Sequence, residues 1–136
     1  MNKYNAFNHA KFSIRYHMIF SVKYHRKMLQ PIIDDLKKSF SRAAFQQPWR
    51  IITVETDAIK DHHIHLLVSA NPIIAPNGIV SRLKQFSTYD MWHSHYSYMR
   101  KFFWKGEHHL WTRGYFCSTI GDVSEKTLKA YIEKQG

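Results

Sequence analysis

The pattern of hydrophobic and polar positions predicts alternating strands and helices in the first half of the chain. Residues 11–24 are rich in β-branched and aromatic side chains with partial alternation, which is typical of a long strand. Apolar residues then recur at helical spacing over 32–45, so we expect a helix there, opened by Pro31. Residues 49–55 and 62–69 again have strand character and are predicted to form a hairpin.

The second half continues this alternation. Helical spacing returns over 78–92, and 111–120 is predicted to be a strand, while 93–110 shows no clear period. Ser124 is a suitable N-cap for a last helix over 125–134. We therefore predict a single α+β domain over all 136 residues, of ferredoxin-like β-α-β-β-α-β order. It would have an antiparallel sheet, helices on one face, and an added C-terminal helix.

The net charge of the chain indicates which kind of partner it binds. Twenty Lys and Arg against ten Asp and Glu give a net charge of +10. A basic surface of that size favours nucleic acid, although a membrane surface or simple solubility would also fit the charge. The chain also has nine Phe, eight Tyr and four Trp. Those exposed beside Lys or Arg would form a stacking surface for unpaired bases.

Composition also bears on the compartment and on metal chemistry. A single cysteine, Cys117, excludes an internal disulfide and a cysteine-based zinc site. No apolar run approaches the ~20 residues that span a bilayer. Residues 1–9 lack the apolar core of a signal peptide. We therefore expect a cytoplasmic protein.

A His-x-His triplet is the first candidate for chemistry. On a strand, residues i and i+2 point to the same face, so His63 and His65 could bind one metal ion, while His62 points the other way. Taken alone, the triplet favours packing residues over a metal site, because chance gives roughly 0.7 such triplets at this histidine content. A second triplet, formed by His93 and His95, lies near a predicted helix end. Its side chains would diverge by about 200°, so we treat it as unrelated.

The predicted last helix carries a second pattern. Tyr131 and Gln135 are four residues apart and therefore share one helix face, about 40° from one another. A half-buried packing tyrosine and a solvated helix end would show the same spacing. The two patterns gain weight only from the sequence that surrounds them.

Short motifs follow one another in a fixed order along nearly the whole chain. They are Tyr16-His17, Val22-Lys23-Tyr24-His25-Arg26-Lys27, Glu55, Asp61-His62-His63-Ile64-His65-Leu66-Leu67-Val68, Ile79-Val80-Ser81-Arg82-Leu83-Lys84, Leu110-Trp111-Thr112-Arg113-Gly114-Tyr115-Phe116, Val123-Ser124 and Tyr131-Ile132-Glu133-Lys134-Gln135. This ordered set resembles the single-tyrosine HUH transposases of the smallest insertion sequences, the IS200-like family.

The resemblance implies a role for each matched residue. His63 and His65 would be the paired histidines of the HUH motif, which bind a divalent cation. Tyr131 would be the nucleophile, and Gln135 the third protein ligand, one helical turn further on. The chain departs from the family pattern in the extra His62, which could compete for metal if the strand register slipped. Gln135 also lies at a helix end, where fraying would weaken metal binding.

These residue types suit the cleavage of single-stranded DNA. Two imidazoles and one amide oxygen leave positions open on Mg²⁺ or Mn²⁺ for a phosphate oxygen and water, and the nitrogen ligands favour Mn²⁺. Attack by Tyr131 would give a 5′-phosphotyrosine and a free 3′-hydroxyl. The step is reversible, because one phosphodiester replaces another. Excision needs two cut ends, so one nucleophile per chain predicts a homodimer, and the resemblance implies that active sites can be assembled in trans.

We therefore expect a transposase whose partner is single-stranded DNA with hairpins at element ends. The candidate DNA contacts are Lys23, Arg26, Lys27, Arg82 and Lys84. The dimer is expected to form through edge pairing of the strand over 11–24. Two alternatives stay open. A domesticated relative that processes repeated palindromic elements would use the same chemistry. A non-catalytic ferredoxin-like module would bind nucleic acid through a basic, aromatic sheet face.

Overall fold

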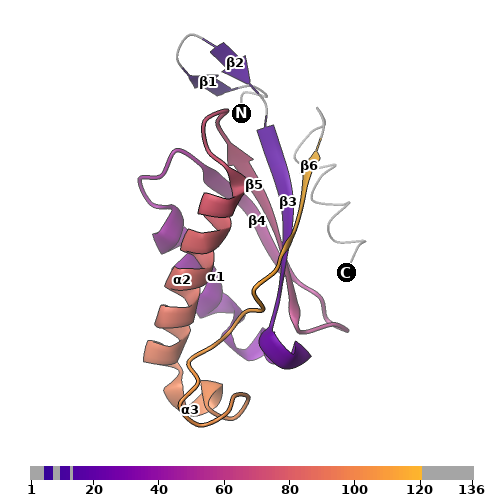
Figure 1. Ribbon diagram of the computed structural model, residues 1–136, viewed down its shortest axis with the longest axis vertical. Coiled ribbons are helices and arrows are strands. Elements are labelled where there is room, and N and C mark those ends of the chain that lie inside the picture. Colours follow the sequence, from indigo (N-terminus) through magenta and orange to yellow (C-terminus); the bar gives the residue numbers. More distant parts are fainter. Residues whose placement is uncertain (1–4, 8–9, 13, 121–136) are drawn as a thin grey trace.

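A four-stranded antiparallel sheet forms the centre of the computed structural model, which describes residues 5–7, 10–12 and 14–120 (Figure 1). Its strands, in the order β4-β5-β3-β6, are β3 (Ile14–Ser21), β4 (Arg50–Thr56), β5 (His63–Ala70) and β6 (Phe116–Ile120). A separate hairpin consists of β1 (Asn5–Phe7) and β2 (Ala10–Phe12). The helix predicted over 125–134, which includes Tyr131, and Gln135 directly after it lie outside the described residues.

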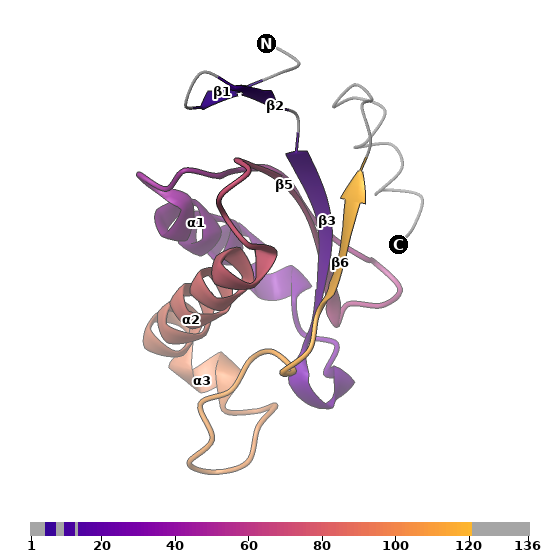
Figure 2. The same ribbon diagram turned by 45° about the horizontal axis from the view of Figure 1, so that its top comes forward.

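Helices cover one face of the sheet (Figures 1 and 2). They are α1 (Ile33–Ala44), α2 (Pro76–Ser94) and the short α3 (Tyr96–Met99), with 3-10 turns η1 (Lys23–His25) and η2 (Gln30–Ile32). Pro76 occupies the first turn of α2, where its missing N–H costs nothing. Asp34 and Asp35 lie in the first turn of α1, where acidic side chains favour the helix dipole. The predicted α+β class is confirmed.

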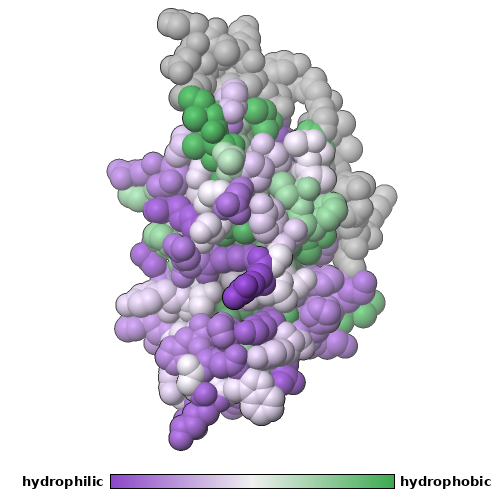
Figure 3. All heavy atoms as spheres, in the orientation of Figure 1, coloured by the Kyte–Doolittle hydropathy of each residue, from purple (hydrophilic) through white to green (hydrophobic). Residues whose placement is uncertain are grey.

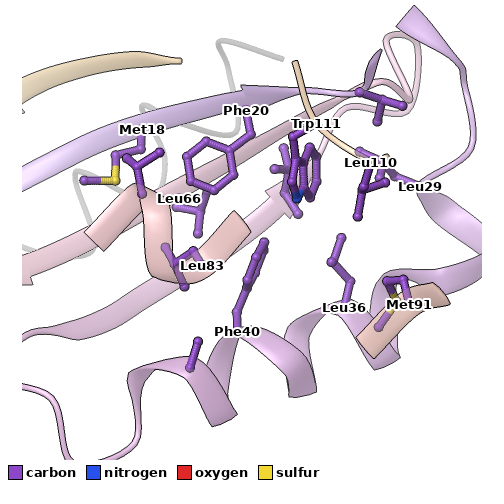
Figure 4. Packing of buried hydrophobic residues seen from close by; sticks show 14 of the residues in the cluster. Met18, Phe20, Leu29, Leu36, Phe40, Leu66, Leu83, Met91, Leu110 and Trp111 are labelled. Atoms are coloured by element: carbon purple, nitrogen blue, oxygen red, sulfur yellow. The ribbon is translucent and has the colours of Figure 1, made fainter. Parts of the chain in front are cut away.

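The core lies between the sheet and these helices (Figure 4). Alternate residues of the strands point into it, among them Phe20 of β3 and Leu66 of β5, which face Phe40 of α1. The Phe20 ring meets Phe40 edge-on at 6.3 Å and Trp111 at 5.6 Å. Each fully buried side chain of this size contributes roughly 1.5–3 kcal/mol to folding. The other residues of the strands lie on the opposite face of the sheet.

The structure corrects two predicted strands. The strand expected over 11–24 is divided between β2 and β3, and it ends in η1, where Tyr24 and His25 have φ angles of 63° and 51°. The strand expected over 111–120 begins only at Phe116, and Trp111 forms an isolated bridge with Val22. Leu110 and Trp111 are apolar because they pack into the core and not because they lie in a strand.

Edge pairing through the strand over 11–24 was also a wrong prediction. β3 is an inner strand of the sheet, paired with β5 along Ile14–Ser21 and with β6 over residues 15–19. Its backbone groups are therefore already used within the chain. The edge strands of the described sheet are β4 and β6.

The exposed surface is largely polar. The side of the molecule seen in Figure 3 is mostly hydrophilic, with hydrophobic groups in separate small areas. Among the described helices, none is long and apolar enough to cross a membrane.

Candidate metal centre

The histidine pair predicted on a strand lies at the start of β5. Ile64 and Leu66 point into the core, which leaves His63 and His65 on the sheet face turned away from α1 and α2. His65 lies opposite Ile19 of β3 and Glu55 of β4 in the sheet register. We call this side of the sheet the histidine face, defined by His63, His65 and one further histidine, His17 of β3.

His65 is buried, with 4% of its surface exposed. Its Nδ1 lies 3.2 Å from Nε2 of His17, and the two rings are stacked with centroids 5.5 Å apart. Its Nε2 is buried without a hydrogen-bond partner among the described residues. Burial, together with the nearby His17 and His63, lowers the pKa of His65 to about 4. His65 is therefore neutral at neutral pH, the form that binds a metal ion.

The adjacent histidines are also held in their neutral forms. His63 is half-buried, and burial is the main cause that lowers its pKa. His62 stacks on His25 of η1 at 4.9 Å, and its ring meets that of His63 edge-on at 4.2 Å. The contact with His25 gives the extra histidine a packing partner of its own.

One carboxylate lies close enough to influence both histidines of the pair. Asp57, in the turn between β4 and β5, is buried, and its Oδ1 accepts a hydrogen bond of 2.9 Å from the Ile59 N–H. Burial alone would raise the pKa of Asp57, but the backbone N–H donors of Lys60 and Ile59, together with the charges of His65 and Lys60, lower that pKa overall. The resulting negative charge opposes the lowering of the pKa at His63 and His65 and would favour a cation beside them.

A divalent cation fits this site on one observation: Nε2 of His65 is a buried ring nitrogen that lacks a partner within the described part of the chain. Across residues 5–7, 10–12 and 14–120, no group of three His, Cys, Asp or Glu is arranged to hold a metal. Two histidines alone would need another ligand. Gln135, the third ligand expected from the sequence, and the nucleophile Tyr131 both lie outside the described residues.

Sequence reasoning missed His17 and Asp57. The alternation of β3 places His17 on the same face as the His-x-His pair, but only the β3–β5 register shows that it meets His65. Asp57 carried no sequence signal, because a single aspartate in a turn is common. The side chains of the second triplet have separate partners: His93 stacks on Tyr89, and His95 pairs with Asp35 at 2.6 Å.

Comparison with known proteins decides the family. The family described as "Transposase IS200 like" matches residues 10–135. The chain belongs to this transposase family. The family places it among DNA-processing enzymes of transposition and recombination.

Individual relatives agree with this membership. The chain is 31% identical over 125 residues to the ISDra2 transposase TnpA of Deinococcus radiodurans, covering 91% of this chain and 85% of that protein. A crystallised protein of Deinococcus radiodurans, described as a transposase, shares the fold with a TM-score of 0.73 at 23% identity, over 96% of this chain and 97% of the other. A REP-associated tyrosine transposase bound to a REP hairpin shares it with a TM-score of 0.60 at 11% identity, over 97% and 68%.

The basic residues expected to touch DNA fall into two groups in this transposase. Three lie in or just after η1: Lys23, Arg26 and the exposed Lys27. Arg82 and Lys84 lie on α2, and both have intramolecular partners. Arg82 Nε donates to the Ala43 carbonyl at 2.6 Å. Lys84 Nζ donates to three carbonyl oxygens of the segment over 112–114, at 2.8, 3.2 and 2.9 Å. The Lys84 ammonium therefore holds the approach to β6 in place.

The segment without a clear sequence period helps to form a hollow on the transposase surface. We call it the aromatic hollow; it measures about 600 Å³ and is lined by Lys84, Gln85, Thr88, Tyr89, Trp92, His93 and His108. His108 stacks on Trp92 at 4.4 Å, and Tyr89 is 67% exposed. A second hollow of about 320 Å³ shares Trp92 and His108 and adds cationic side chains, Arg100 and Lys105. Rings beside cations are what unpaired bases and their phosphates contact.

Proposed function

We propose that this transposase cuts and rejoins single-stranded DNA through a covalent bond to Tyr131, with a divalent cation at His63 and His65. The observation that carries the proposal is the buried, unpartnered Nε2 of His65 beside a second neutral histidine on the same face of β5. The family membership supports the reaction class.

The proposed cleavage exchanges one ester for another. The phenol oxygen of Tyr131 would bond to phosphorus while the bond from phosphorus to the 3′ oxygen breaks. The products are a 5′-phosphotyrosine and a 3′ oxygen, which takes up a proton to become a hydroxyl. Because tyrosine has an ordinary pKa near 10, only about one phenol in a thousand is ionised at pH 7, so the proton must leave as the bond forms. The reverse step rejoins DNA without ATP.

The histidines would hold Mg²⁺ or Mn²⁺, with Gln135 as the third protein ligand. When bound, the cation would polarise the scissile phosphate and orient the 3′-oxygen leaving group. His63 and His65 contribute neutral nitrogen ligands, so no proton has to be displaced from either ring for binding at neutral pH. Nitrogen ligands favour Mn²⁺ over Mg²⁺.

The proposed substrate is single-stranded DNA with hairpins at the ends of a mobile element. The net charge of +10 favours a polyanion, and the aromatic hollow offers rings for unpaired bases. The solved relative bound to a REP hairpin supports a hairpin as the recognised shape. Lys23, Arg26 and Lys27 are the proposed phosphate contacts near η1, and Arg82 is the one on α2. Lys84 is not proposed as a contact, because its three N–H donors are already used by the carbonyls of 112–114.

We further propose a homodimer, with active sites that two subunits can complete in trans. Two element ends must be cut and held, and each chain offers one nucleophile of this kind. Within the described sheet, β4 and β6 are the edge strands, so a shared sheet would form through one of them.

The decisive experiment traps the covalent intermediate. The protein is incubated with single-stranded DNA from the gene's own flanks and Mn²⁺, and adducts that survive denaturation are mapped by peptide sequencing. DNA should be attached to Tyr131, and both Tyr131→Phe and His65→Ala should form no adduct, while the control Tyr115→Phe forms it normally. DNA on another tyrosine, or undiminished cleavage by His65→Ala, would refute the proposal.

A second candidate function is the processing of repeated palindromic elements by a domesticated relative. The likeness to a REP-associated transposase favours it, although that likeness shows the fold alone. The chemistry would be the same, so the flanking DNA distinguishes the two: scattered palindromes without element ends would favour the second candidate.

A further inference from the structure

The contact between His17 and His65 joins two strands across 48 residues of sequence. His17 lies opposite Leu67 in the β3–β5 register, two residues from His65, so the histidines are diagonal neighbours on one face. His17 is buried, with 1% of its surface exposed. The Phe116 ring of β6 contacts the His17 ring edge-on, with the ring centroids 5.8 Å apart. The His17 ring is therefore held between side chains of both neighbouring strands.

Hydrogen bonding between two neutral imidazoles allows only two arrangements. Either His65 Nδ1–H donates to His17 Nε2, or His17 Nε2–H donates to His65 Nδ1. In the second arrangement, His65 carries its proton on Nε2, at a buried position that lacks an acceptor among the described residues. In the first, the same Nε2 presents a lone pair, which can bind a cation. Only the first arrangement makes His65 a metal ligand.

We propose that His17 is a positioning residue: its Nε2 accepts the Nδ1–H of His65 and thereby fixes the tautomer and ring orientation in which His65 Nε2 binds the cation. The inference rests on the metal centre of the proposed function. Histidine ligands of metal ions commonly donate their other N–H to a fixed acceptor, and loss of that acceptor typically weakens metal binding 10–100-fold. An imidazole on the inner strand β3 would supply that acceptor here.

The first test needs no metal. Long-range ¹H–¹⁵N NMR spectra of the metal-free protein distinguish a protonated Nδ1 from a protonated Nε2 in each histidine. The proposal expects His65 in the Nδ1–H form in the natural protein, with a smaller share of that form in His17→Leu. A His65 that is protonated on Nε2 in the natural protein would overturn it.

The second test measures Mn²⁺ binding by the loss of the free-ion electron paramagnetic resonance signal. In His17→Gln, the amide oxygen can reach the position of Nε2, so affinity should stay close to that of the natural protein. In His17→Asn, the amide is one methylene too short, so the dissociation constant should rise by about 10–100-fold. These two variants carry the same polar group, which makes their comparison independent of whether His17→Leu folds. Thermal melting without metal checks that both are folded.

The outcomes separate the inference from the proposed function. A natural protein that binds no Mn²⁺ would overturn the metal centre and with it the ligand role of His65, while the tautomer measurement would still show whether His17 accepts the Nδ1–H of His65. A natural protein that binds Mn²⁺, together with an unchanged affinity in His17→Asn, would overturn the role of His17 alone. Weakened binding in both His17→Asn and His17→Leu, with recovery in His17→Gln, supports it, because leucine fills the buried space without offering an acceptor.

Discussion

A buried ring nitrogen without a hydrogen-bond partner costs roughly 1–3 kcal/mol in a folded protein. His65 Nε2 is such an atom within the described residues, and its ring cannot move away because Nδ1 is engaged by His17. A ligand that satisfies Nε2 would therefore favour the folded state. Functional sites often keep a polar group that folding alone would not select.

Mn²⁺ should raise the thermal stability of the protein through His65. A cation that binds only the folded form at 100 times its dissociation constant contributes about 2.7 kcal/mol, which corresponds to several degrees in Tm at this size. Calorimetry with and without Mn²⁺ measures the shift, and His65→Gln should lose it. A shift of equal size in that variant would place the bound ion elsewhere.

Stability should also fall in mildly acidic solution. The pKa of His65 is about 4 in the folded state against an ordinary value of 6.5, so between these values the unfolded chain binds more protons. Stability due to this group is therefore present above pH 6.5 and is lost as the pH falls towards 4. Between pH 7.5 and 5, we expect about 2 kcal/mol from His65. Urea unfolding at both pH values should show a smaller loss in His65→Gln, and an equal loss would contradict the assignment.

At the scale of elements, the spacing of apolar residues was enough to predict that four sheet strands and two long helices form, but not the bounds of the first and last of those strands. The β-branched and periodic segments are locally consistent, so they form the same elements in the fold. The start of the last strand was predicted too early because the apolar side chain of Trp111 suggested a strand. That side chain instead packs on Phe20 and Phe40, which come from distant parts of the chain. The partnership of His17 with His65 was equally hidden, since it depends on strand register and not on any local pattern.

The Lys84 ammonium joins α2 to the segment that leads into β6. The Lys84 ammonium donates three hydrogen bonds to the carbonyls of 112–114. Burial lowers the pKa of Lys84. Lys84→Met should destabilise the protein by roughly 1–3 kcal/mol, because these charge-assisted bonds are partly shielded from water. The exposed Lys38→Met is the matched control and should change stability by less than about 0.5 kcal/mol. Equal effects of the two variants in urea unfolding would argue against the anchoring role.

Substitution of Tyr89, on α2, tests whether the aromatic hollow binds DNA. Tyr89 is 67% exposed, so Tyr89→Ala should leave Tm nearly unchanged, but it should weaken hairpin binding by the 1–3 kcal/mol typical of one stacked base, about 5–150-fold. Phe45 is 69% exposed and lies outside the hollow, which makes Phe45→Ala the control. Fluorescence anisotropy with a labelled hairpin measures both. Similar affinities of the two variants would remove the hollow from the DNA-binding surface.

At the scale of the whole molecule, a net charge of +10 on 136 residues makes salt the sharpest probe of the proposed substrate. The logarithm of the binding constant should fall with the logarithm of salt concentration, by about 0.7 for each phosphate contact on a single strand. Charge reversal at the exposed Lys27 (Lys27→Glu) should make the slope shallower. A duplex bound more tightly than its separated strands would contradict single-strand specificity.

β3 is paired on both sides, and His17 is part of it. Amide hydrogens in such an inner strand usually exchange with solvent only when the whole domain unfolds. Edge strands and loops open locally at a lower free-energy cost. The part of β3 that carries His17 would then not open locally while the rest of the domain stays folded. Hydrogen exchange along β3 should proceed at the rate of global unfolding, and the capacity to bind Mn²⁺ should disappear on heating together with the fold and not before it.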